Sequence, residues 1–310
     1  MVKRSSMQHS VESVRAKKWV GLGARAALLL VGAIWGSSLI VVKSAAEYIS
    51  PNFLIALRFT AAFAVLALIL RKRLRNVSRS LLGRCAVIGA CLFLAYWIQT
   101  IGVTFAMPGK SAFLSSIYCV LVPFIYWLIS GQKPKLRNLV AAALCVAGIV
   151  LTSMTGGFTM AFGDVLALLS GVFFAAHIAV VGKLGQGEDP IVVTILQFGF
   201  CSLFAWIATF ALEGLHMTWD TRALGGVLYL TLFCTTLALL LQNVGQKYAS
   251  PASASILMST ESVFGILFSV LFAGEVVTAR LAVGFALIFA ALLVSEVQLP
   301  VKQRTKGYKA

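Results

Sequence analysis

The sequence is poor in charged residues, above all in acidic ones. Asp and Glu together number 10 among 310 residues, against 26 Lys and Arg, and charged residues make up 12% of the chain. Soluble globular domains carry about 25%. With 60% hydrophobic residues and a mean hydropathy of +0.93, the chain has more apolar sequence than one soluble core could bury. These values exclude an ordinary soluble domain and indicate a polytopic membrane protein.

The sequence also lacks the motifs of metal, redox and nucleotide chemistry. Its six cysteines lie in or beside apolar runs, and no pair has the C-x-x-C spacing of a metal site. We interpret them as small hydrophobic residues. There is no G-x-x-x-x-G-K-[ST] motif for ATP, and no dyad expected of an intramembrane hydrolase. We therefore predict that the chain is not an enzyme and needs no cofactor or metal.

Ten apolar segments are each about long enough to cross the membrane as a helix, which takes about 20 residues. They lie at about 25–43, 51–70, 82–104, 110–129, 136–153, 163–184, 190–212, 225–248, 251–272 and 279–297. The segments show no period-2 alternation, which favours helices over barrel strands. The sequence therefore predicts an all-α membrane protein with ten transmembrane helices.

The basic residues predict how these helices are oriented. If the N-terminus lies in the cytoplasm, 21 of the 26 Lys and Arg fall on the cytoplasmic side, four fall outside, and Arg58 remains within a span. This bias follows the positive-inside rule and predicts that both termini are cytoplasmic, in the plasma (inner) membrane. It also accounts for the net charge of +16 without a nucleic-acid partner. The first apolar run lacks a cleavage site, so we expect a retained span rather than a signal peptide.

The two halves of the chain repeat each other. "GAIWGSS" at 32–38 aligns with "GVFFAAH" at 171–177, and "PNFLIALRF" at 51–59 aligns with "PIVVTILQF" at 190–198, both at an offset of 139. Each copy holds five spans, and an odd number forces the copies into opposite orientations. We therefore predict two inverted five-helix repeats related by a pseudo-two-fold axis in the membrane plane, a plan typical of secondary transporters.

From the third span onward the offset becomes 143, which pairs Gln99 with Gln242 and Gly131 with Gly274. The change fits a longer loop around 213–224. The predicted organisation is a basic cytoplasmic tail at 1–24, a first repeat at 25–153, a second repeat at 163–297 and a basic cytoplasmic tail at 298–310.

The stretches "AIWGSSLIVVKSA…SPNFLIALRF" and "ASPASASILMSTESVFGILFSVLFAGE" carry a family resemblance. Over roughly 25–297 the chain resembles the drug/metabolite transporter superfamily, specifically its ten-span exporters with two EamA domains. The clearest marks are W-G at 35–36, R-F at 58–59 and G-E at 274–275. The resemblance implies a central cavity between the halves, with spans 5 and 10 peripheral, and export of amino acids, other small metabolites, nucleotide sugars or drugs.

Two charged side chains within spans are candidates for function, because a charge at the bilayer centre costs about 2.5–3.5 kcal/mol. Arg58 and Glu261 lie well inside spans 2 and 9, and they could pair across a cavity. Glu261 stands where the first repeat has Tyr118. We predict that Glu261 binds an amine or couples proton movement to transport. For both residues a structural role is the alternative; for Arg58 it is favoured, because this arginine marks the family across many substrates.

Other polar and aromatic residues complete the candidate set. His177 can titrate near neutral pH, Gln99 and Gln242 are repeat mates expected to line one cavity, and aromatic walls suit apolar or cationic substrates. Packing is the alternative for each. The predicted substrate-binding residues are Trp35, Arg58, Tyr96, Gln99, Tyr118, His177, Gln242 and Glu261.

Three expectations concern helix geometry. Gly32 and Gly36 form a small-x-x-x-small pair that allows close helix packing. Asp164 is expected to cap the start of span 6. Pro123 is expected to kink span 4.

The combined prediction is a secondary transporter that exports a small organic metabolite, such as an amino acid, by alternating access around a midplane cavity. A proton-coupled multidrug or cation exporter, with Glu261 as its site, is one alternative. A non-transporting membrane scaffold is another. The predicted partners are the lipid bilayer and a small-molecule substrate, while protons and a homodimer are left open.

Overall fold

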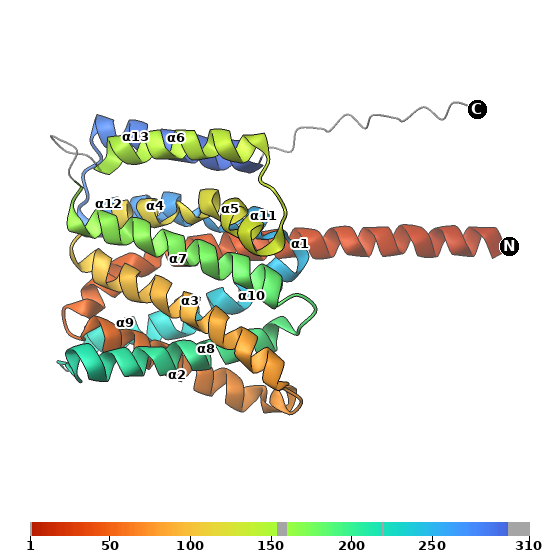
Figure 1. Cartoon of the computed structure of the whole chain (residues 1–310), viewed down its shortest axis with the longest axis horizontal. Coiled ribbons are helices and arrows are strands. Elements are labelled where there is room, and N and C mark those ends of the chain that lie inside the picture. Colours follow the sequence, from red (N-terminus) through yellow and green to blue (C-terminus); the bar gives the residue numbers. More distant parts are fainter. Residues whose placement is uncertain (1, 154–159, 219, 297–310) are drawn as a thin grey trace.

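The protein is a bundle of helices. The computed structural model describes residues 2–153, 160–218 and 220–296, and the regular elements in these ranges are helices (Figure 1). The predicted all-α class is confirmed. Residue 297 and the predicted tail at 298–310 lie outside the described residues. Residues 2–24 of the predicted N-terminal tail are helical and continuous with the first span.

Eight helical stretches among the described residues are long and apolar enough to cross a membrane. In the first repeat they are α1 (Val2–Ala46, apolar from Val20), α2 (Pro51–Ile69), α3 (Arg79–Thr104), and α4 (Pro108–Ser115) with α5 (Tyr118–Ser130). In the second repeat they are α7 (Phe162–Leu184), α8 (Pro190–Ala208) with the π-helix η2 (Thr209–Glu213), α9 (Thr221–Tyr229) with the π-helix η3 (Leu230–Leu237) and α10 (Ala238–Tyr248), and α11 (Pro251–Met258) with α12 (Glu261–Ala273).

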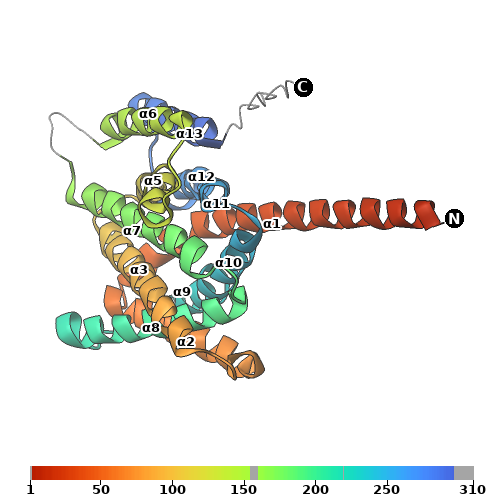
Figure 2. The ribbon, with the colours of Figure 1, turned by 45° about the vertical axis from the view of Figure 1, so that its right-hand side comes forward.

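Two shorter apolar helices, α6 (Leu136–Ser153) and α13 (Ala279–Glu296), complete the predicted ten. They pack against each other at one edge of the bundle, as Figures 1 and 2 both show. The short 3₁₀ helix η1 (Arg71–Leu74) follows α2. The peripheral position that the resemblance implies for spans 5 and 10 agrees with this arrangement.

The helix ends follow from local sequence. Proline occupies the first turn of α2, α4, α8 and α11, where its missing N–H costs nothing. The repeat mates Gly131 and Gly274 end α5 and α12 in the left-handed region, at φ 76° and 65°, which glycine adopts without a steric penalty. The expectation that Asp164 caps α7 is wrong. Ala161 is the N-cap residue, and the Asp164 carboxylate binds a lysine instead.

Spans 4 and 9 are each divided into two half-helices by a tightened turn. The N–H of Cys119 donates to the carbonyl of Ser116 at 3.2 Å, and that of its repeat mate Ser262 donates to the carbonyl of Ser259 at 3.0 Å. These are the i→i+3 bonds of a 3₁₀ turn. The interruption of span 4 precedes Pro123, which lies inside α5.

The contacts between helices follow the symmetry of the inverted repeat. Helix α2 packs on α8 and α6 packs on α13, so equivalent helices meet across the axis. The contact of α3 with α7 is mirrored by that of α10 with α1. Glycines at equivalent positions allow this packing: a Cβ on Gly32 would clash with Thr260 and the carbonyl of Met258, and one on Gly171 would clash with Ile117 and the carbonyl of Ser115. Gly32 and Gly171 therefore press α1 and α7 against the interrupted spans.

The bundle has two faces, which we name by the chain. The N face is the one from which α1 projects, and it carries the α2–α3, α5–α6, α7–α8 and α10–α11 connections (Figure 1). The opposite face carries the α1–α2, α3–α4, α8–α9 and α12–α13 connections.

We predict that Gly32→Ala and Gly171→Ala each destabilise the protein, by about 1–3 kcal/mol, because the added methyl group meets backbone as well as side-chain atoms. Melting curves of the purified variants in detergent would measure this. Gly83→Ala is the matched control, since a Cβ at Gly83 meets nothing within 4 Å. Equal melting temperatures for Gly171→Ala and Gly83→Ala would contradict the packing argument.

Candidate functional site

A small polar pocket lies at the centre of the bundle, where both repeats contribute side chains. Its cavity volume is about 20 Å³, which is room for about one water molecule. The residues lining it are Trp35, Ser38, Leu39, Tyr96, Gln99, Ala112, Tyr118, Phe174 and Glu261. Five of the eight predicted site residues therefore lie together, although they are spread over more than 220 positions of the sequence.

The interrupted spans place two of these side chains. Tyr118 is the first residue of α5 and Glu261 is the first residue of α12, directly after the tightened turns. Tyr118 and Glu261 are repeat mates of each other, so the pseudo-two-fold axis brings a phenol and a carboxylate to the same pocket. The scaffold is symmetric here, but its chemistry is not.

Glu261 is buried, with 8% of its surface exposed. Its Oε1 accepts a hydrogen bond from the Ser116 hydroxyl at 3.2 Å. Among the described residues, the ion pairs are Arg73–Asp189, Arg84–Glu188 and Lys110–Asp164, so none involves Glu261. A carboxylate thus faces the central pocket with a neutral hydroxyl as its hydrogen-bond donor.

Arg58 is fully buried beside the pocket. Its Nε and Nη2 donate to the Thr235 hydroxyl at 3.2 and 3.0 Å, and its guanidinium lies over the Tyr96 ring, 5.2 Å from the centroid. The third nitrogen, Nη1, has no hydrogen-bond partner. Since a buried guanidinium needs polar partners, Arg58 has hydrogen-bonding capacity left for a further group.

The π-helix η3 supplies the partners of two predicted residues. Thr235 binds Arg58, and the carbonyl of the preceding Cys234 accepts from Trp35 Nε1 at 2.9 Å. The equivalent span of the first repeat, α3, is a regular α-helix. Widened turns of this kind are frequent at functional sites. The sequence offered no sign of η3, although threonines stand at 231, 235 and 236 in this apolar run.

The remaining predicted residues lie outside the central pocket. His177 is buried and its Nε2 lies 3.0 Å from Oε1 of Gln197, the repeat mate of Arg58. Gln242 is buried on α10, and neither atom of its amide has a hydrogen-bond partner. Gln99, in contrast, lines the central pocket and donates to the Ser115 hydroxyl at 3.4 Å. The two repeat mates therefore lie in different surroundings instead of lining one cavity.

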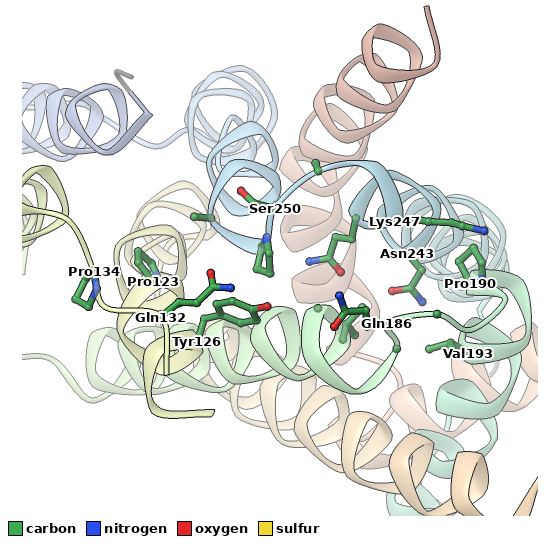
Figure 3. Close-up of a pocket in the computed structure, with 18 of the residues that line it drawn as sticks. Pro123, Tyr126, Gln132, Pro134, Gln186, Pro190, Val193, Asn243, Lys247 and Ser250 are labelled. Carbon is green, nitrogen blue, oxygen red and sulfur yellow. The ribbon is translucent and has the colours of Figure 1, made fainter. Parts of the chain in front are cut away.

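A larger cavity opens at the N face, and we call it the vestibule. Its volume is about 530 Å³, within the range of small-molecule sites. It lies between the α5–α6 and α7–α8 connections, the end of α10 and the start of α11. The side chains of Gln132, Gln186 and Asn243 surround it in Figure 3.

The opposite face is closed by contacts between distant segments. Lys110 Nζ lies 2.6 Å from Asp164, whose side chain is 2% exposed. The Glu275 carboxylate accepts from the N–H groups of Gly109 and Lys110 at 3.0 and 3.1 Å, at the start of α4. The N–H of Asn52 likewise donates to a carboxylate from the second repeat, at 2.9 Å.

Two inverted five-helix repeats, a polar centre, a cavity at one face and joined segments at the other are the plan typical of membrane transporters. Comparison with known proteins gives the family. Residues 23–154 and 161–296 each match the EamA-like transporter family, and the chain belongs to that family, within the drug/metabolite transporter superfamily. It is an integral membrane protein with two EamA domains.

Relatives match over most of their length. An uncharacterized transporter of Archaeoglobus fulgidus is 30% identical over 86% of this chain and 83% of its own. The uncharacterized transporter YvbV of Bacillus subtilis is 26% identical over 92% of this chain and 94% of its own. A solved crystal structure is similar with a TM-score of 0.62 and 20% identity, covering 91% of this chain and 96% of that one, which supports the fold.

We predict that Thr235→Val destabilises the protein by about 1.5–3 kcal/mol, because it removes the oxygen that accepts two hydrogen bonds from a buried guanidinium. Thr235→Ser keeps that oxygen and should melt within a few degrees of wild type. Melting temperatures in detergent test the pair. If both variants melt alike, the hydroxyl is not what stabilises Arg58.

Proposed function

We propose that the protein exports a small organic metabolite, such as an amino acid, by alternating access, with the N face in the cytoplasm. The observation that carries this proposal is the buried polar pocket between an open and a closed face, with Arg58 and Glu261 beside and within it. The charge bias of the loops supports the cytoplasmic assignment of the N face and of both termini. The plasma (inner) membrane fits the same bias.

The two cavity volumes support an inward-facing state with a contracted centre. The vestibule holds about 530 Å³ and the central pocket about 20 Å³, so a metabolite fits the first but not yet the second. Binding at the centre requires the lining helices to separate. The tightened turns of spans 4 and 9 are suited to this movement, because Tyr118 and Glu261 directly follow them.

Opening to the outside would break the contacts of the opposite face. Lys110–Asp164 and the Glu275 contacts join α4 to α7 and to the end of α12. In an inverted-repeat transporter, such contacts form in one state and separate in the other. We infer that these contacts form the outer gate.

Export is best tested by finding what the protein moves. Cells overproducing it should accumulate one or a few metabolites in the medium, measured by untargeted mass spectrometry, and Arg58→Gln should abolish the accumulation. The same strains should show no added resistance to lipophilic cations. Resistance that disappears in Glu261→Ala, without metabolite accumulation, would favour a multidrug or cation exporter. No flux for a broad panel of metabolites in proteoliposomes would contradict transport altogether.

We predict that Glu261 couples transport to protons, since its carboxylate faces the pocket with a hydroxyl rather than a cation as hydrogen-bond partner. An imposed pH gradient should drive accumulation of the exported metabolite by wild-type proteoliposomes. Glu261→Gln should lose this drive while still exchanging labelled for unlabelled metabolite. Glu47→Gln, at an exposed site, is the control. Glu261→Gln vesicles that respond normally to the gradient would remove the coupling role.

A further inference from the structure

A seam of buried polar side chains connects the vestibule to Arg58. Gln246 and Gln242 lie one turn apart on the same side of α10, and Thr235 lies seven residues before Gln242, in the π-helix η3 that leads into α10. Asn243 lies beside them and donates to Thr194 on α8 at 2.8 Å.

Most amide groups of this seam lack hydrogen-bond partners. Both side-chain polar atoms of Gln242 and of Gln246 are buried and unpaired, as is Oδ1 of Asn243. These residues are only 1%, 8% and 3% exposed. Leaving one buried polar group unpaired costs about 1–3 kcal/mol. Several such groups in a row are suited to binding water or a polar solute.

The two ends of the seam have the same sign of charge. At the vestibule end, the basic lining residues are Lys133, Lys135, Arg137 and Lys247, which we call the basic rim. The one acidic residue that lines the vestibule is Glu188, which is held by Arg84. At the other end, Thr235 holds Arg58, whose Nη1 is unpaired. Between these basic ends the seam is neutral.

From this arrangement we propose that the seam is the path by which the substrate passes from the vestibule to the centre, and that the substrate carries an anionic group such as a carboxylate. The basic rim concentrates anions in the vestibule. The glutamine and asparagine amides then offer hydrogen-bond donors to the anionic group in turn. Arg58 receives it at the end of the path, where a guanidinium binds a carboxylate through paired N–H donors. The proposal rests on the proposed function and excludes lipophilic cations as the main substrates.

Thiol labelling tests the path without any transport measurement. In Gln246→Cys, the new thiol faces the seam. In Val244→Cys it lies about 200° around the same helix, at a half-buried site that does not line the vestibule. Purified protein in neutral detergent is treated with two methanethiosulfonates, one bearing a sulfonate and one a trimethylammonium group. The wild type, whose cysteines are buried except for the half-buried Cys91, measures background labelling.

For each variant, the rate of labelling by the anionic reagent is divided by the rate of labelling by the cationic reagent. This ratio is then divided by the ratio of the rates at which the two reagents react with 2-mercaptoethanol in solution, which corrects for their different reactivity. We expect this normalised ratio to be about tenfold higher at Gln246→Cys than at Val244→Cys, because the basic rim concentrates the anionic reagent. Replacing Lys133, Lys135 and Lys247 by Gln removes three of the four basic lining residues and should lower it most of the way to the Val244→Cys value. If Gln246→Cys is not monodisperse, Gln242→Cys one turn deeper takes its place.

Equal ratios at the two positions, a preference for the cationic reagent, or no labelling at either seam position would overturn the proposal. Labelling needs no transport, so its result is independent of the export assay. A charge-selective path without export would contradict the proposed function alone. Export without charge selectivity would contradict the path alone.

Discussion

The close approach of α1 and α7 to the interrupted spans is the constraint on which the rest of the structure depends. Gly32 and Gly171 allow these helices to pack directly against the backbone of the turns before α12 and α5. A larger residue would push the turns away. The two turns are what bring Glu261 and Tyr118 to the centre. The two glycines therefore determine where the Glu261 carboxylate and the Tyr118 phenol lie. Small residues are the usual means of close helix association in membranes.

The repeat supplies a symmetric scaffold, and function departs from that symmetry at a few positions. Tyr118 stands opposite Glu261, and Arg58 corresponds to Gln197. The regular helix α3 corresponds to a span that contains the π-helix η3. Glu261 and Arg58 are thus charges that one repeat has and the other lacks, and η3 supplies Thr235 as the hydrogen-bond partner of Arg58. The backbone is therefore close to symmetric, while the charged and polar side chains at the centre are not.

Much of the fold and part of the site could be predicted from the sequence. Hydropathy and the two offsets gave the ten helices and their repeat, because a membrane imposes length and an odd span count imposes inversion. Trp35, Tyr96 and Gln99 could be assigned to one pocket because their helices surround the axis. The partner of Asp164 and the surroundings of Gln242 could not be predicted, because each depends on which distant helix lies against that residue. Thr235 was missed because hydropathy carries no sign of a π-turn.

The contacts of Glu275 at the opposite face have a consequence for the balance between the two states. Its repeat mate is Gln132, which lines the vestibule near the start of α11. If Gln132 made the equivalent contact with the start of α11, its amide would cap that helix as the Glu275 carboxylate caps α4. An amide oxygen is a weaker acceptor than a carboxylate, so such a contact of Gln132 would be weaker than the contact that Glu275 makes. This difference favours the arrangement seen here, with the vestibule open and the opposite face held together.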